Sequence, residues 1–70
     1  MKSYKQLTDT FEELCEKNYV SPPVGPSQEL TKQERISNIQ GMAEKARQAF
    51  PDNEETEEFL SDCEEFLANQ

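Results

Sequence analysis

The sequence predicts an all-α fold, a small three-helix bundle with a proline-rich loop between its first and second helices. Three separate runs of apolar residues recur at spacings of three and four, the period of an amphipathic helix. The four prolines fall between these runs and never inside one. Seventy residues suffice for one domain with a small core. We therefore expect a single acidic helical domain over residues 1–70, with helices near 4–18, 32–50 and 54–68.

The first helix is predicted from an apolar stripe that begins almost at the start of the chain. Ser3 followed by Gln6 has the pattern of a capping box, in which each residue bonds the backbone of the other. The stripe consists of Tyr4, Leu7, Phe11, Leu14 and Cys15. Three prolines within residues 22–26 stop the helix and favour an extended, proline-rich linker over residues 20–29.

The second helix is predicted from a second capping box, Thr31 with Glu34, and from a heptad-like stripe. That stripe consists of Ile36, Ile39, Ala43, Ala46 and Phe50. Pro51 ends it. Residues 46–53 resemble the junction between consecutive tetratricopeptide repeats, but the chain holds no second copy of this segment. We therefore expect an ordinary turn between two antiparallel helices.

The third helix is predicted from Asp52 or Asn53 as its N-cap, with Glu55 or Thr56 completing a capping box. Its apolar stripe consists of Phe59, Leu60, Cys63, Phe66 and Leu67. Packing the three stripes together predicts a core made of Leu7, Phe11, Leu14, Ile36, Ile39, Ala43, Phe50, Phe59, Cys63, Phe66 and Leu67.

The net charge of −8 lies entirely in the last 20 residues. Residues 1–50 contain seven acids and seven bases, whereas residues 51–70 contain eight acids and no Lys or Arg. Such a block repels nucleic acid and anionic membranes, and it attracts basic surfaces. We therefore expect a larger protein with a basic surface as the partner, with no direct nucleic acid binding and no membrane association.

The residues that catalysis and metal binding require are scarce in this chain. There is no His, the two glycines stand alone, and Cys15 and Cys63 are too far apart in the sequence for a zinc motif. We therefore expect no enzymatic activity, no cofactor and no metal site. The N-terminus has no apolar run of the signal-peptide type, so we expect a cytoplasmic protein with free, buried thiols, or one in the host cytoplasm if it is phage-encoded.

The outer face of the third helix is the first candidate for partner binding. Its members are acidic residues at helical spacing: Glu54, Glu55, Glu57, Glu58, Asp62, Glu64 and Glu65. Over residues 52–65 the helix carries about one charge per 2.6 Å of its axis, against one per about 3.4 Å along a single DNA strand. This similarity indicates that the helix can occupy a phosphate-binding groove. Two glutamates near the helix C-terminus oppose the helix dipole, which favours a functional use of the acidity.

The outer face of the second helix is the other candidate surface. It carries Ser37, Asn38, Gly41 and Lys45 opposite the apolar stripe. A glycine inside an exposed helix costs about 1 kcal/mol relative to alanine. Because their side chains are small, Ser37 and Gly41 define a shallow strip on which another backbone can lie.

The composition favours a non-catalytic inhibitor or regulator that binds a basic site of a larger protein, such as a nucleic-acid-binding site. In size and charge the chain resembles phage-encoded host-takeover and anti-defence proteins, including anti-CRISPR proteins and nucleic-acid mimics. The alternative is a small assembly or adaptor subunit that binds through apolar or small-residue helix faces, with acidity serving only solubility. A self-associating, antitoxin-like module is a third possibility, and we expect a monomer or a weak dimer.

Overall fold

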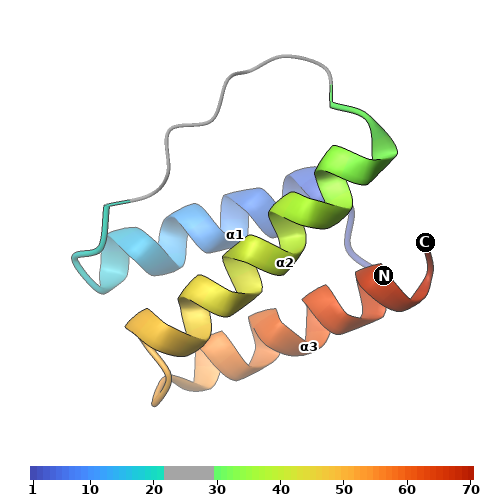
Figure 1. Cartoon of the computed structure of the whole chain (residues 1–70). Helices are drawn as coiled ribbons and strands as arrows, with labels where there is room; N and C mark the ends of the chain where they lie inside the picture. Colours follow the sequence, from blue (N-terminus) through green and yellow to red (C-terminus); the bar gives the residue numbers. More distant parts are fainter. Residues whose placement is uncertain (22–29) are drawn as a thin grey trace.

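Three helices form the protein in the computed structural model, which describes residues 1–21 and 30–70 (Figure 1). They are α1 (Tyr4–Lys17), α2 (Lys32–Ala49) and α3 (Glu54–Ala68). Each end lies within one residue of its predicted position. The described residues form no strand, so the predicted all-α three-helix bundle is confirmed. Most of the predicted proline-rich linker, residues 22–29, lies outside the described residues.

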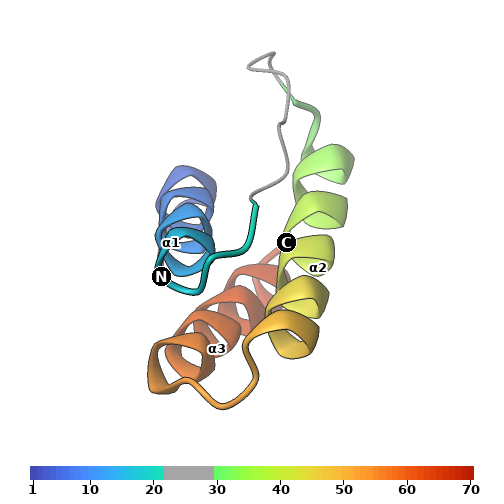
Figure 2. The same cartoon turned by 90° about the vertical axis from the view of Figure 1, so that its left-hand side faces the viewer.

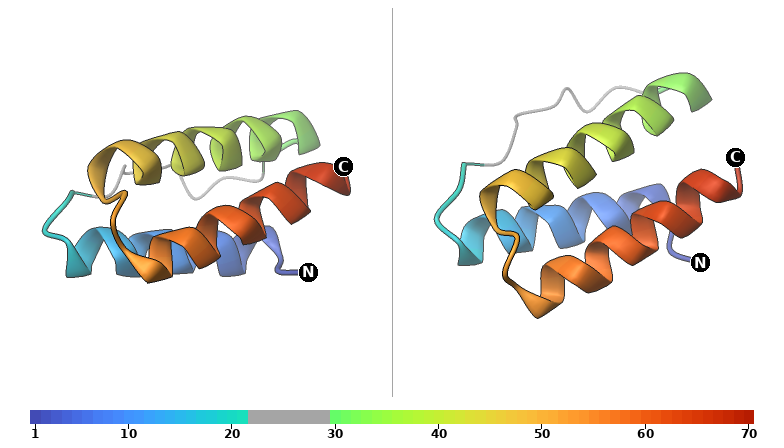
Figure 3. Two further views of the ribbon diagram at one scale, coloured as in Figure 1. Left: turned by 90° about the horizontal axis from the view of Figure 1, so that it is seen from below. Right: turned by 60° about the horizontal axis from the view of Figure 1, so that its bottom comes forward.

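Every helix packs against the other two (Figures 2 and 3). Helices α1 and α3 run in opposite directions, as two ion pairs show. Lys17 at the end of α1 pairs with Glu55 at the start of α3. Lys2, just before α1, pairs with Asp62 in the second half of α3. The end of α1, the α2–α3 turn and the start of α3 therefore lie at one end of the bundle (Figure 2).

Two of the three predicted capping boxes are present. The Ser3 hydroxyl accepts from the Gln6 backbone N–H at 3.2 Å, and the Gln6 side chain accepts from the Ser3 N–H at 2.8 Å. Thr31 and Glu34 exchange the same two bonds at 3.2 and 3.0 Å. At α3 the predicted box is wrong, because the Asn53 side chain alone caps the helix through the Glu55 N–H.

The core is organised around three phenylalanines, one from each helical segment. The ring of Phe11 stacks on that of Phe59, with centroids 5.7 Å apart, and lies 6.4 Å from that of Phe50. Around these rings lie the buried side chains of Leu7, Leu14, Cys15, Ile39, Met42, Ala43, Ala46, Cys63 and Phe66. Nine of the eleven predicted core residues are therefore buried.

Two predicted core positions differ from the pattern. Four residues outside the predicted core list are also buried, of which Cys15 and Ala46 lie on the predicted stripes and Met42 and Thr56 do not. Ile36 is only partly buried and lies outside the core cluster, because the first two turns of α2 bury no side chain. Leu67 is half-buried at the edge of the core. Met42 is buried instead, beside the stripe, and Thr56 is completely buried although the sequence suggested a capping role.

Thr56 provides a direct test of the core, because its buried hydroxyl has no hydrogen-bond partner among the described residues. A buried, unsatisfied polar group costs about 1–3 kcal/mol. Replacing Thr56 with valine keeps the shape and removes the hydroxyl, so we expect the free energy of unfolding to rise by about 1–2 kcal/mol. Urea denaturation measures this change. A Thr56→Ser variant, which keeps the hydroxyl but loses the methyl group, should be destabilised; a less stable valine variant would contradict this placement.

Candidate functional site: the acidic face of α3

The acidic face is the set of seven carboxylates predicted to bind a partner, and all of them lie on α3. Six are exposed, namely Glu54, Glu55, Glu57, Glu58, Glu64 and Glu65. Asp62 is only partly exposed, since it lies at the side of α3 that faces α1. The seven residues therefore share one helix but do not form one uniform surface.

The second half of α3 has its charges paired within the molecule. The Lys2 ammonium lies 3.0 Å from the Asp62 carboxylate, and an Arg47 nitrogen from α2 lies 4.0 Å from Glu64. The N-terminal ammonium lies 3.3 Å from Glu65. Glu64 and Glu65 thus have intramolecular partners, and their position near the helix C-terminus does not itself indicate a functional use.

The first half of α3 keeps most of its charge unpaired. Glu55 pairs with Lys17 at 3.0 Å, and this hydrogen bond raises the pKa of the Lys17 ammonium. Glu54, Glu57 and Glu58 form no ion pair within the described residues, and residues 22–29 contain no Lys or Arg. We call these three residues the free acidic cluster. The helix dipole favours the acids of the first turn, but Glu58 lies beyond it.

On α2, the four residues of the second candidate face are all exposed. Asn38 is already engaged, because its side-chain amide donates to the Tyr4 hydroxyl at 3.0 Å. A Cβ built on Gly41 would meet nothing within 4 Å. The described part of the fold therefore gives no steric reason for a glycine at this position.

The open space at Gly41 predicts that alanine is tolerated and stabilising. Because a mid-helix glycine costs about 1 kcal/mol relative to alanine, Gly41→Ala should raise the free energy of unfolding by about this amount. Chemical denaturation followed by circular dichroism measures it. Replacing Ala49, the exposed last residue of α2, with glycine is the reverse control and should be destabilising. A destabilised Gly41→Ala variant would show that the glycine is needed for folding.

Both cysteines are free and buried, as the apolar stripes predicted. Burial raises the pKa of the Cys63 thiol to about 12, and the nearby Asp62 carboxylate contributes to the same shift. Burial also raises the pKa of Cys15. Both thiols therefore stay protonated in the folded protein at neutral pH, the form in which a cysteine behaves as a small apolar side chain.

This raised pKa predicts a loss of stability in alkaline solution. In the unfolded chain Cys63 loses its proton near its ordinary pKa of 9.0, whereas in the folded protein it keeps the proton up to about pH 12. Between these values the unfolded state binds fewer protons, so stability falls with pH, by up to about 1.4 kcal/mol per pH unit. Urea denaturation from pH 8 to pH 11 measures this slope. A Cys63→Ala variant should show a shallower slope, and an identical slope would contradict the buried, protonated thiol.

The described residues contain no group of three His, Cys, Asp or Glu side chains placed to hold a metal ion. None of the helices in residues 1–21 and 30–70 combines the length and apolar character that crossing a bilayer requires. Comparisons with protein families, with curated proteins and with solved structures found no match to this chain.

Proposed function

We propose that the protein is a non-catalytic inhibitor or regulator that places the first half of α3 against a basic surface of a larger cytoplasmic protein. The observation that supports this is an asymmetry in charge pairing. The fold supplies cations to Asp62, Glu64 and Glu65, but it leaves the free acidic cluster exposed and unpaired among the described residues. Like charges at i, i+4, such as Glu54 and Glu58, repel each other and destabilise a helix. A basic partner would relieve this repulsion.

The free acidic cluster is suited to steering and specificity rather than to deep burial. Exposed charges accelerate association with an oppositely charged surface, and this acceleration falls as salt screens the charges. A partner that normally binds a nucleic acid backbone presents such a surface. Inhibition would then follow from occupying that surface, which requires no catalytic group on this chain.

Two triple variants with the same net charge test this proposal. The first removes the free acidic cluster (Glu54→Gln, Glu57→Gln and Glu58→Gln), and the second removes three exposed carboxylates elsewhere (Asp9→Asn, Glu13→Gln and Glu44→Gln). The immobilised wild type and both variants are used to capture proteins from a lysate of the cells in which the chain occurs. We expect a partner that the wild type and the second variant retain at low salt and the first does not. A partner retained equally by both variants would contradict the proposal.

The open space at Gly41 supports a second candidate, an adaptor subunit that binds through the small-residue face of α2. In that case the acidity of α3 serves only solubility. A partner that binds by backbone contact at this face would be lost from Gly41→Ala, although the fold is more stable. The same partner would remain bound to the variant that lacks the free acidic cluster, and it would resist added salt.

A further inference from the structure

Tyr19 combines an unfavourable backbone conformation with an almost fully exposed aromatic ring. Its φ is 57°, in the left-handed region that favours glycine, and the residue is 98% exposed. The Val20 N–H donates to the Cys15 carbonyl at 2.8 Å, and the Tyr19 N–H donates to the Glu16 carbonyl at 3.3 Å. These two bonds close the end of α1 in the pattern known as a Schellman motif, whose left-handed position is usually glycine. The cap itself therefore does not require an aromatic residue here.

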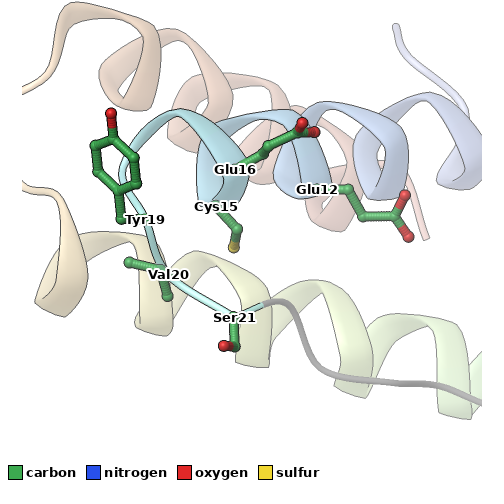
Figure 4. A pocket seen from close by; sticks show the side chains of 6 residues that line it. All are labelled: Glu12, Cys15, Glu16, Tyr19, Val20 and Ser21. Atoms are coloured by element: carbon green, nitrogen blue, oxygen red, sulfur yellow. The ribbon is translucent and has the colours of Figure 1, made fainter.

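A hollow of about 460 Å³ lies beside this ring, lined by Glu12, Cys15, Glu16, Tyr19, Val20 and Ser21. Figure 4 shows the Tyr19 ring at one end of this row of side chains and Glu12 at the other, with Glu16 between them. Both glutamates are exposed, and neither forms an ion pair with any described residue. The hollow also lies at the C-terminal end of α1, where the helix dipole favours positive charge.

The other tyrosine shows what such a ring binds in this protein. The guanidinium of Arg35 lies over the Tyr4 ring, 5.7 Å from its centroid, and Asn38 donates to the Tyr4 hydroxyl. Tyr19 has no such cation among the described residues, although the carboxylates of Glu16 and Glu12, which line the same hollow, add to the attraction for one. A guanidinium is planar, stacks on an aromatic face and bonds a carboxylate at the same time, whereas an ammonium acts as a point charge.

We propose that the hollow between Tyr19 and the carboxylates of Glu12 and Glu16 binds an arginine side chain of a basic partner. The inference extends the proposed function, since it assumes a basic partner, but it uses a different surface. Figure 2 shows the end of α1 at the same end of the bundle as the start of α3. The hollow at the end of α1 and the free acidic cluster in the first half of α3 therefore lie toward the same end of the bundle.

A peptide titration separates the two surfaces. A peptide of six arginines and a peptide of six lysines are each added, at low salt, to the ¹⁵N-labelled full chain, and amide shifts are followed by NMR. We expect the arginine peptide to shift residues 16–21 and to bind several-fold more tightly there than the lysine peptide. Tyr19→Gly should weaken arginine binding at this site at least fivefold, whereas Tyr19→Phe, which keeps the ring, should not.

The glycine variant should fold at least as stably as the wild type, because glycine adopts the observed φ without strain, and its thermal midpoint checks this. Glu16→Gln, which leaves the backbone unchanged, should also weaken binding. Equal affinity of Tyr19→Gly and wild type, or shifts confined to α3, would overturn the inference while leaving the proposed function standing. Shifts confined to residues 12–21 would support the inference and contradict the proposed function, and no shifts at all would overturn both.

Discussion

Phe59→Ala is expected to remove most of the stability of this domain, about 3–5 kcal/mol. The Phe59 ring is 1% exposed and stacks on Phe11, which in turn lies beside Phe50, so the three rings connect all three helical segments. The total free energy of unfolding of a domain of this size is roughly 4–10 kcal/mol. The variant should therefore be largely unfolded near 37 °C, as circular dichroism and thermal denaturation would show.

Leu67→Ala is the matched control, because Leu67 lies on the same helix but is only half-buried at the edge of the core. Its truncation removes less buried surface and should lower the thermal midpoint far less. If Phe59→Ala and Leu67→Ala unfolded at similar temperatures, the stack of Phe11 on Phe59 would not be the centre of the core.

The helix boundaries could be predicted from the sequence because local interactions set them. Ser3 with Gln6 and Thr31 with Glu34 need only their own backbone to form a cap, and the structure shows both. Thr56 is the exception: the same local pattern predicted that it could complete a capping box at the start of α3. Because it lies three residues before Phe59 on the buried side of α3, its side chain is in the core and cannot also cap the helix.

The depth of packing was harder to predict because it depends on how the helices lie relative to one another. The heptad-like stripe of α2 begins at Ile36, but burial begins at Ile39. A repeat in the sequence shows which side of a helix is apolar, whereas the angle between helices decides how much of that side is covered.

The candidate site was predicted as a set of residues but not as a pattern of charge. All seven acids lie on α3, as expected, but the cations that pair with four of them come from other segments: the N-terminal ammonium and Lys2 before α1, Lys17 from α1 and Arg47 from α2. The left-handed conformation of Tyr19 had no signal in the sequence, because it is imposed on a residue type that normally avoids it.

Removing the free acidic cluster is expected to weaken partner binding at least tenfold at low salt, which corresponds to about 1.4 kcal/mol. Glutamine keeps the helix propensity and nearly the size of glutamate, so Glu54→Gln, Glu57→Gln and Glu58→Gln together should leave α3 folded. Lower repulsion among these side chains should offset the loss of favourable charge at the helix N-terminus. Far-UV circular dichroism and the thermal midpoint verify the fold before binding is compared.

The most direct test is the rate at which the captured partner associates with the wild type and with the two triple variants, measured by stopped flow over a series of salt concentrations. We predict a steep fall with salt for the wild type and for the Asp9→Asn, Glu13→Gln and Glu44→Gln control. The variant without the free acidic cluster should associate more slowly at low salt and depend less on salt. Identical rates and salt dependence for the two triple variants would contradict a binding role for the first half of α3.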